Sequence, residues 1–280
     1  MAATLPPTMG LALSRSLGTG RLDVIRVGVS GAGGRMGATV CRAVAGDDEL
    51  ELVAAVDPGS VGGTVEGIAI SASQDAFAAA GCDVVVDFTV AGAARETVPA
   101  VLAHGIHAVV GTTGLSDGDL DTFAKVASAD GAGHVLVAAN FSISAVLLMR
   151  LSELAAPYFD TAEIIELHHD NKADAPSGTA LVTADRMAAA SAAWAPDPTK
   201  KEVLPGARGG VGPAGIRVHS VRMRGMVAHQ EVILGATGQT LTLRQDSYDR
   251  DSFMPGVLLA CKRIADLPGL TRGLDALLDL

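Results

Sequence analysis

The hydrophobic positions near the start of the chain form runs typical of a nucleotide-binding α/β unit. The run Asp23–Val29 is rich in β-branched residues and glycines follow it at once, as after a buried parallel strand. Helix-like composition follows at Met36–Ala45, and a second apolar run covers Leu50–Val56. The pattern therefore predicts a strand, helix, strand unit that ends at Asp57.

Three further apolar runs continue this alternation. Each follows an Ala-rich stretch that could form a crossover helix, as parallel strands require: Val84–Phe88, Ile106–Val110 and Val135–Ala139. The first part of the chain is thus expected to form a Rossmann-like, doubly wound parallel sheet.

The pattern changes beyond Asn140. A helix-like segment extends to about Pro157, and then strand-like runs follow one another with less helix between them: Glu163–His168, Ile216–Met223, Glu231–Ala236 and Thr240–Arg244. Neighbouring strands of this kind predict a mixed or antiparallel sheet in a second, α+β domain.

The length of 280 residues favours two domains, although one domain stays possible. We expect a disordered extension at 1–21, with a targeting peptide as the alternative, a dinucleotide-binding domain at 22–140 with 252–280 packing back on it, and the second domain at 141–251. The Pro- and Gly-containing stretch Ala195–Gly215 is predicted to be a long loop inside the second domain, and its length invites a functional role.

Charge and composition exclude several classes of protein. A net charge of −10 and 3% aromatic residues argue against a nucleic-acid partner. No apolar run approaches the roughly 20 residues that cross a bilayer, so no membrane partner is expected. The cysteines Cys41, Cys82 and Cys261 have neither pair nor metal-ligand spacing, so no metal is expected and reduced thiols in a cytoplasm fit best.

A glycine-rich loop lies between the first strand and helix. Glycines there allow a pyrophosphate to approach the backbone N–H groups at the helix start. The loop residues are Gly31, Ala32, Gly33, Gly34, Arg35, Met36 and Gly37. Asp57 could accept hydrogen bonds from ribose hydroxyls and favours NAD, whereas Arg35 could pair with the 2′-phosphate of NADP, so NADH and NADPH both stay open. A plain tight turn is the alternative.

The segment Glu166–Ala180 carries the densest chemistry. Ser177, Gly178 and Thr179 precede a predicted helix at Ala180–Ala193 and could present N–H and hydroxyl groups to a carboxylate. His169 and Lys172 would add positive charge nearby. The alternative is an ordinary helix cap at Ser177 or Thr179 and a solvated Lys172.

His168 is the histidine that we expect to be catalytic, because imidazole exchanges protons near neutral pH. Both His168 and His169 can face one cavity only if the strand is already opening into a loop. Structural roles are expected for His104, His107 and His134. His219 and His229, with Arg222 and Gly225 nearby, fit a structural or a functional role equally well.

Six ordered motifs together resemble the 4-hydroxy-tetrahydrodipicolinate reductase family, long called dihydrodipicolinate reductases. They are Gly-Ala-Gly-Gly-Arg-Met-Gly at 31–37, Asp-Phe-Thr at 87–89, Gly-Thr-Thr-Gly at 111–114, Asn-Phe-Ser at 140–142, the segment with His-His-x-x-Lys and Ser-Gly-Thr at 166–179, and Val-Ala-His-Gln-Glu at 227–231. The glycine loop is common to many families, whereas His-His-x-x-Lys with Ser-Gly-Thr is specific to this one. The resemblance extends from about Val24 to the C-terminus.

The resemblance implies a reaction and a set of roles. A nicotinamide would deliver hydride to a cyclic unsaturated dicarboxylic imine in lysine and diaminopimelate biosynthesis. His168 would be the acid, and Lys172 is expected with it in the catalytic pair. The substrate carboxylate would be held by Lys172 and His169 with Ser177, Gly178 and Thr179.

The resemblance also extends the cofactor site and implies assembly into a homotetramer through the sheets of domain 141–251, the substrate-binding domain. Gly111, Thr112 and Thr113 would approach the nicotinamide, and Asn140 and Phe141 would lie at the hinge. The added cofactor residues are Phe88, Thr89, Gly111, Thr112, Thr113, Ala139, Asn140 and Phe141. Some members carry Glu and then Arg where this chain has Asp57 and Pro58, which leaves the NADP preference open.

Two rival interpretations remain. An aspartate-semialdehyde dehydrogenase would need a nucleophilic cysteine in the second domain, and none of the three cysteines falls there. A non-catalytic nicotinamide-sensing protein would keep the glycine loop, but it would have no need of His168 and Lys172 beside an anion site.

Overall fold

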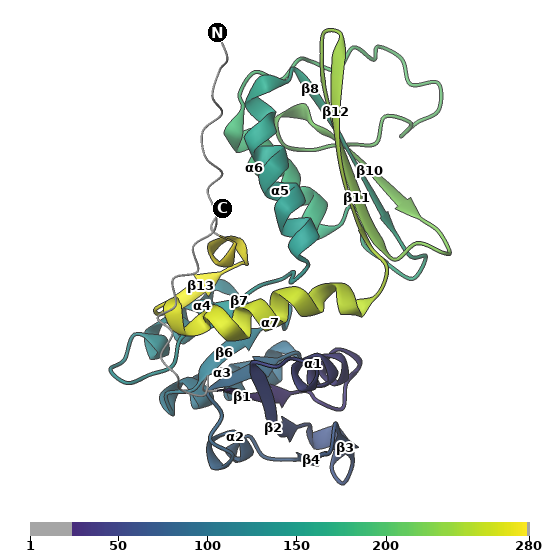
Figure 1. Cartoon of the computed structure of the whole chain (residues 1–280). Coiled ribbons are helices and arrows are strands. Elements are labelled where there is room, and N and C mark those ends of the chain that lie inside the picture. The colour runs from purple at the N-terminus through teal and green to yellow at the C-terminus, as the bar shows by residue number, and fades with distance from the viewer. Residues whose placement is uncertain (1–23, 279–280) are drawn as a thin grey trace, which may run out of the picture.

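The computed structural model describes residues 24–278, so the predicted extension 1–21 lies outside the described residues. Figure 1 shows two lobes, one built on an eight-stranded sheet and the other on a five-stranded sheet. Among the described residues, no helix has the length and apolar character needed to cross a membrane.

The first sheet is doubly wound, as predicted. Its order is β13-β7-β6-β5-β1-β2-β4-β3, and its neighbours are parallel except β3 and β4. The strands are β1 (Ile25–Ser30), β2 (Leu50–Val56), β3 (Thr64–Val65), β4 (Ile68–Ser71), β5 (Val84–Asp87), β6 (His107–Val110), β7 (Val135–Val137) and β13 (Leu270–Arg272). The order reverses between β1 and β5, so the carboxyl ends of these strands border the crevice where such folds bind ligands.

Both faces of this sheet are covered, which explains the continuous apolar runs of its strands. One face packs against α1 (Arg35–Ala45) and α7 (Met254–Arg263). The opposite face packs against α2 (Asp75–Ala79), α3 (Ala91–Ala103) and α4 (Asp117–Ala127). Successive residues of β5 alternate between the two cores, with Val84 and Val86 in one and Val85 in the other.

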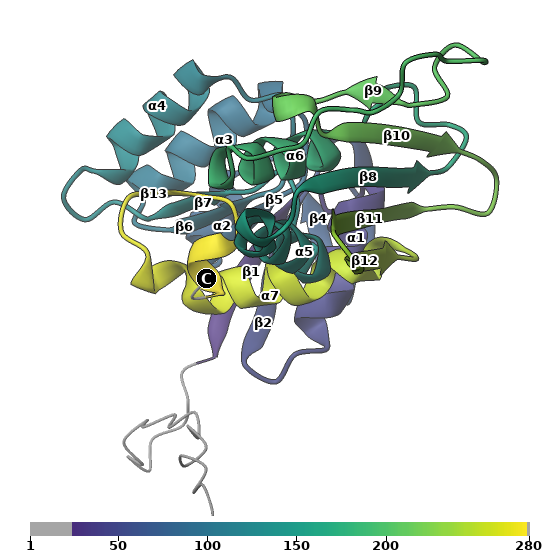
Figure 2. The same ribbon diagram turned by 90° about the horizontal axis from the view of Figure 1, so that it is seen from above.

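The second sheet is mixed and carries helices on one face only (Figures 1 and 2). Its order is β12-β11-β8-β10-β9, and only β8 and β10 are parallel. The strands are β8 (Thr161–His168), β9 (Gly210–Val211), β10 (Arg217–Arg222), β11 (Ala228–Ala236) and β12 (Gln239–Ser247). Helices α5 (Ile143–Ala155) and α6 (Gly178–Ala190) pack on it around buried Leu148, Ile164 and Met187.

Several predicted boundaries were wrong. Helix α6 spans Gly178–Ala190 instead of 180–193, because Ser177 caps it by accepting a hydrogen bond from the Ala180 N–H at 3.2 Å. The stretch Ala195–Gly215 is not purely loop, since it contains β9. Within residues 24–278, six 3₁₀ turns complete the elements: η1 (Pro58–Ser60), η2 (Ala156–Tyr158), η3 (Pro213–Gly215), η4 (Arg250–Phe253), η5 (Ile264–Asp266) and η6 (Asp275–Leu277).

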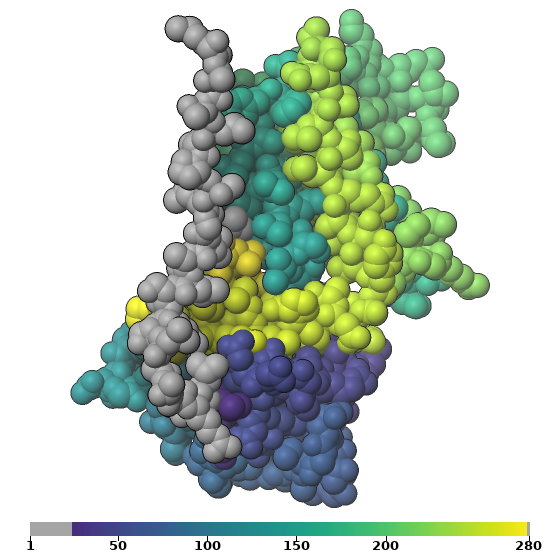
Figure 3. Space-filling model, in the orientation of Figure 1, coloured from purple at the N-terminus to yellow at the C-terminus, as the bar shows by residue number. Residues whose placement is uncertain are grey.

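The C-terminal part of the described chain completes the first sheet. Helix α7 packs against α1 and β1, and β13 adds a parallel strand beside β7. In Figure 3 the yellow atoms of α7 lie directly on the purple and blue atoms of the first lobe. The precise limits of the two domains, near residues 140 and 251, stay a prediction.

Candidate active site

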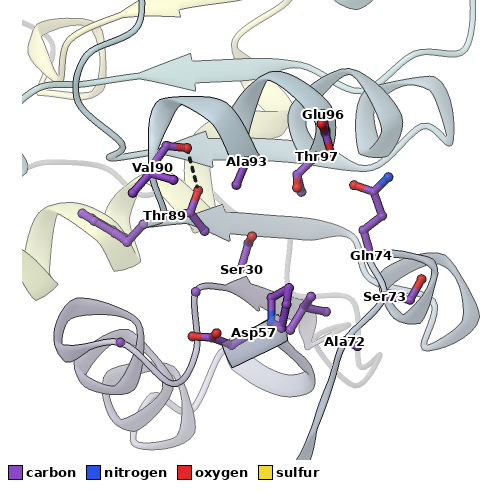
Figure 4. A pocket seen from close by; sticks show the side chains of 15 residues that line it. Ser30, Asp57, Ala72, Ser73, Gln74, Thr89, Val90, Ala93, Glu96 and Thr97 are labelled. Carbon is purple, nitrogen blue, oxygen red and sulfur yellow. Dashed lines mark hydrogen bonds between the residues drawn. The ribbon is translucent and has the colours of Figure 1, made fainter. Parts of the chain in front are cut away.

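A cavity of about 560 Å³ opens at the carboxyl ends of β1, β2 and β5. Figure 4 shows Ser30, Asp57 and Thr89 converging on it from three different strand ends, with α3 on the far side. Of the predicted cofactor residues, five line it: Gly31, Gly34, Asp57, Phe88 and Thr89. The cavity thus occupies the crevice of the doubly wound sheet, where a dinucleotide binds in this fold.

The glycine loop is closely fitted to its surroundings. A Cβ at Gly37 would lie 2.0 Å from the carbonyl oxygen of Gly31, and a Cβ at Gly33 would lie 2.0 Å from Ser60 Oγ. Gly31 has a φ of 81°, which glycine adopts readily. Only glycines therefore let this chain turn from β1 into α1 with the backbone beside the cavity, so the loop fits a pyrophosphate.

Asp57 holds the glycine loop against the end of β2. Its Oδ2 accepts from the Gly33 N–H at 3.0 Å and its Oδ1 accepts from the Gly59 N–H at 2.9 Å. A carboxylate accepts about four hydrogen bonds, so acceptor capacity is left for ribose hydroxyls. Arg35 is the first residue of α1, and its exposed side chain is not part of the cavity lining.

Asp87 ties together the loops that follow β5 and β6. Its Oδ1 accepts from Thr112 Oγ1 at 2.6 Å and from Thr89 Oγ1 at 2.8 Å, and the Thr89 N–H donates to Thr112 Oγ1 at 2.8 Å. A Cβ at Gly111 would lie 2.2 Å from the ring of Phe88, so glycine is needed there as well. Gly111, Thr112 and Thr113 thus follow β6 next to the cavity without lining it.

A second cavity, of about 210 Å³, lies where helices α5 and α6 begin. Both N-cap residues, Ser142 and Ser177, line it. The amino end of a helix carries partial positive charge, and two such ends at one cavity favour an anion. The full lining is Ala139, Asn140, Ser142, Ala145, His168, Ser177, Thr179, Ala228, His229, Gln230, Gln245, Ser247 and Phe253.

His168 is held at the wall of this second cavity by a buried carboxylate. Its Nδ1 is 2.5 Å from Glu166 Oε2, which leaves Nε2 for a ligand. Burial lowers the pKa of His168, and although Glu166 opposes this, the charges of Lys172 and Arg222 lower it further. Burial would raise the pKa of Glu166, yet hydrogen bonds from Arg222, Ser220 and His168 hold it below its ordinary value.

The predicted substrate residues are only partly brought together. His168, Ser177 and Thr179 line the cavity, whereas His169 is exposed and stands outside it. Strand β8 ends at His168, so the chain has not yet opened enough for both histidines to face inward. Lys172 is paired with Asp174, whose two oxygens are each 2.8 Å from its Nζ, and Gly178 occupies the first turn of α6 without lining the cavity.

The two cavities are linked through the chain that leaves β7. The ring of Phe88, in the first cavity, packs against the ring of Phe141 with centroids 5.6 Å apart. Asn140 lines the second cavity and its Nδ2 is 3.4 Å from Thr179 Oγ1. Asn140 and Phe141 therefore connect the crevice of the first sheet with the start of α6, and Ala139 belongs to the second cavity rather than the first.

Two residues important to this site were missed from the sequence. Glu166 and Arg222 form a double hydrogen bond, with both N–O distances 2.8 Å. The signal for Glu166 was present, because residues two apart on a strand share a face and His168 follows it at that spacing. Arg222 could not be placed without the register, which sets it beside His168 across β8 and β10.

The histidines whose roles were open occupy different places. His229 lines the second cavity, and its Nδ1 is 2.7 Å from Asp246 Oδ1. His219 lies away from that cavity, with Nε2 2.6 Å from Glu163 Oε2. His107 and His134 stack with centroids 5.0 Å apart at the other end of the first sheet, which supports the structural interpretation.

The cysteines do not supply a nucleophile. Cys41, Cys82 and Cys261 are all buried, and burial raises the pKa of each thiol to about 12. A nucleophilic cysteine needs a thiolate at neutral pH, so this weakens the semialdehyde dehydrogenase interpretation.

Comparisons with known proteins agree with this architecture. Residues 25–141 match the family model "Dihydrodipicolinate reductase, N-terminus" and residues 144–278 match its C-terminal counterpart. The 4-hydroxy-tetrahydrodipicolinate reductases of Nocardia farcinica and Beutenbergia cavernae are 50% and 51% identical to the chain. Each alignment covers 91% of the chain and 99% of the relative.

A solved structure gives the same result. The dipicolinate-bound dihydrodipicolinate reductase of Paenisporosarcina sp. TG-14 superposes with a TM-score of 0.82 at 36% identity, covering 90% of this chain and 99% of that one. The NAD complex of GenD2, from gentamicin A biosynthesis, has a TM-score of 0.60 at 14% identity over 94% of this chain and 93% of its own, and shares the fold alone. The two family models together span nearly all the described residues, so the chain belongs to the dihydrodipicolinate reductase family, whose members are oxidoreductases.

Proposed function

We propose that the protein reduces 4-hydroxy-tetrahydrodipicolinate to tetrahydrodipicolinate, through the cyclic unsaturated imine, with NADH or NADPH, in lysine and diaminopimelate biosynthesis. The observation that carries the proposal is His168 on the wall of a cavity that two helix N-termini also border, in a chain of this family. A proton donor beside an anion site is what reduction of an unsaturated dicarboxylate requires.

The cofactor would occupy the crevice at the ends of β1, β2 and β5. Gly31 and Gly34 would approach the pyrophosphate, and Asp57 would accept from the adenosine ribose. A nicotinamide bound there supplies the hydride. Asp57 lines the crevice and Arg35 does not, which supports good use of NADH, while NADPH use depends on Arg35 turning toward a 2′-phosphate. The remaining predicted cofactor contacts do not line this cavity, and they stay part of the proposal: Ala32, Gly33, Met36, Gly37, Gly111, Thr112, Thr113, Ala139, Asn140 and Phe141.

The substrate would lie in the second cavity with one carboxylate at the start of α6. Ser177 and Thr179 line that cavity, and Gly178 between them begins the helix. The relative that binds dipicolinate, a cyclic dicarboxylate, supports this class of substrate. Lys172 and His169 would join the carboxylate site when the loop before α6 closes over the ligand, which requires Lys172 to leave Asp174.

His168 would donate the proton that accompanies reduction. Its Nδ1 is engaged with Glu166, so Nε2 is the donor atom, and a dianion in the cavity favours the protonated ring. Lys172 would add positive charge that stabilises the substrate as it gains electrons. Closure of the lobes through the Asn140–Phe141 connection would exclude water from the reaction.

We propose further that the protein is a homotetramer assembled through the five-stranded sheet. This sheet carries α5 and α6 on one face only, and the other face presents Ile165 and Ile233 beside the polar side chains of Glu163 and His219. A face of this composition suits burial against another sheet. Light scattering of the purified protein should give four times the mass of the chain.

The test of function is oxidation of NADH and of NADPH, followed by nicotinamide absorbance, with substrate formed in place from pyruvate and aspartate semialdehyde by a synthase. We expect synthase-dependent oxidation that collapses in His168→Gln while cofactor binding persists. Cofactor binding without any turnover by the native protein would reject the reductase and favour a nicotinamide-sensing protein instead.

A further inference from the structure

The side chain of Glu166 is fully buried beside the second cavity and collects hydrogen bonds from three elements. Besides its contact with His168 on its own strand, it accepts hydrogen bonds from both terminal nitrogens of Arg222, on β10, at 2.8 Å. It also accepts a hydrogen bond from the Ser177 N–H at the start of α6, at 3.2 Å. Its exposed fraction is 0%. A buried carboxylate with these partners stays ionised, so it places a fixed negative charge against the imidazole.

We propose that Glu166 is the positioning residue that aims His168 at the substrate and favours its protonated form, and that Arg222 limits this effect by sharing the same carboxylate. The inference rests on the proposed function and deepens it. It gives Arg222 a role and leaves the proton transfer itself to His168.

The hydrogen bond to Glu166 sets which nitrogen of His168 can react. Nδ1 donates to the carboxylate, so the proton that moves is the one on Nε2. In the transfer the Nε2–H bond breaks, a C–H bond forms on the substrate, and the ring becomes neutral. A proton from solvent then restores the imidazolium before the next turnover. A carboxylate on Nδ1 stabilises the charged ring between turnovers, as in triads that pair histidine with an acid.

Opposed charges around His168 make its pKa a sensitive balance. Glu166 raises the pKa, whereas burial and the positive charges of Lys172 and Arg222 lower it. His229, on the neighbouring strand β11, lines the same cavity and is itself paired with Asp246. Lys172 is partly neutralised by Asp174, so Arg222 is the fixed cation closest to the Glu166 carboxylate.

The second sheet contains a matched control. Glu163, on the same strand but the opposite face, accepts from His219 Nε2 at 2.6 Å and from Arg208 at 2.5 Å. Glu163 therefore holds a histidine and an arginine as Glu166 does, without facing the second cavity. Replacing it removes an equivalent carboxylate and should leave His168 unchanged.

The experiment follows the ring resonances of His168 through a pH titration of the full-length protein by NMR, with His168→Gln to assign them. Glu166→Gln should lower the pKa of His168 by about one unit, because a hydrogen-bonded negative charge is lost. Arg222→Met should raise it, because the carboxylate then acts on His168 alone. Glu163→Gln should leave it unchanged.

The same variants are then assayed for the pH dependence of kcat/KM, whose high-pH limb reports the acid of the free enzyme. In Glu166→Gln this limb should move to lower pH, so that at pH values above the limb kcat/KM is roughly tenfold lower than in the native protein. In Arg222→Met the limb should move to higher pH. If a single variant fails to fold, the double variant Glu166→Gln, Arg222→Met replaces it in the titration. The pKa of His168 should fall in the double variant as well. An unmoved pKa in Glu166→Gln, or in the double variant, overturns the inference. Shifted pKa values in a protein without turnover would reject the proposed function but keep the coupling.

Discussion

Gly256 in α7 lies so close to Phe141 that a Cβ there would be 2.1 Å from the Phe141 carbonyl oxygen. Phe141 belongs to the segment that leads from the first lobe into α5, so this contact fixes α7 against the connection between the lobes. Gly256→Ala should lower the free energy of unfolding by about 1 to 3 kcal/mol, because the backbone must shift to admit the methyl group.

Urea unfolding of Gly256→Ala checks this prediction, with Gly92→Ala as control. Gly92 lies in α3 and a Cβ there would meet nothing within 4 Å. The Gly92→Ala substitution should stabilise the protein by about 0.5 to 1 kcal/mol, as alanine does in an open helical position. Equal urea midpoints for Gly256→Ala and Gly92→Ala would mean that α7 moves away from Phe141 at no cost in stability.

Gly37→Ala should weaken dinucleotide binding at least tenfold. The added methyl group would push α1 away from Gly31 and so displace the N–H groups that are proposed to bind the pyrophosphate. Calorimetric titration with NADH measures the loss. Gly46→Ala, at the end of the same helix, is the matched control, since its nearest atom would be 3.4 Å away.

Arg35→Ala should separate the two nicotinamide cofactors. Arg35 is exposed at the start of α1 and is the predicted partner of a 2′-phosphate, so its loss should raise the KM for NADPH by about tenfold. The KM for NADH should stay unchanged, because Asp57 is the residue proposed to accept from the ribose hydroxyls. Parallel changes in both constants would assign Arg35 to the pyrophosphate instead.

The His107 and His134 pair should make stability depend on pH below neutrality. Burial, together with His134, lowers the pKa of His107, and its Nδ1 accepts the His134 N–H at 2.9 Å, which a proton on Nδ1 would prevent. The folded state therefore binds protons less readily than the unfolded chain, whose histidines titrate near 6.5. Stability is complete above that pH and declines as the pH falls below it.

Urea titrations between pH 8 and pH 5 measure this decline. His107→Gln should flatten it, although His168, whose pKa is also lowered, adds to the same slope. A slope unchanged by the substitution would show that His107 has the same pKa in both states.

The sequence predicted the first sheet well because parallel strands buried on both faces form continuous apolar runs. It missed β3, β4, β9 and β13, which lie at or next to a sheet edge and lack the continuous buried apolar runs of the equally short β5, β6 and β7. Strand β11 begins at Ala228. The prediction began it at Glu231 because polar His229 and Gln230, which line the second cavity, interrupt the apolar run.

The site shows the same division between local and distant information. Local spacing brought His168, Ser177 and Thr179 together, and all three line one cavity because they lie within one strand-to-helix connection. Lys172 and His169 were expected beside them, yet Lys172 pairs with Asp174 and His169 is exposed. The Glu166–Arg222 contact joins residues 56 positions apart, and only the pairing of β8 with β10 brings them together.

The return of α7 and β13 to the first sheet has a consequence for synthesis on the ribosome. Val27 and Val29 of β1 share a hydrophobic core with Val257 and Ala260 of α7, and these emerge more than 200 residues later. Until then only α1 covers this face of the sheet, and β7 remains an open edge where another strand could pair. The second lobe can fold while the first waits, so this protein should rely on chaperones that shield a half-covered sheet more than its final stability suggests.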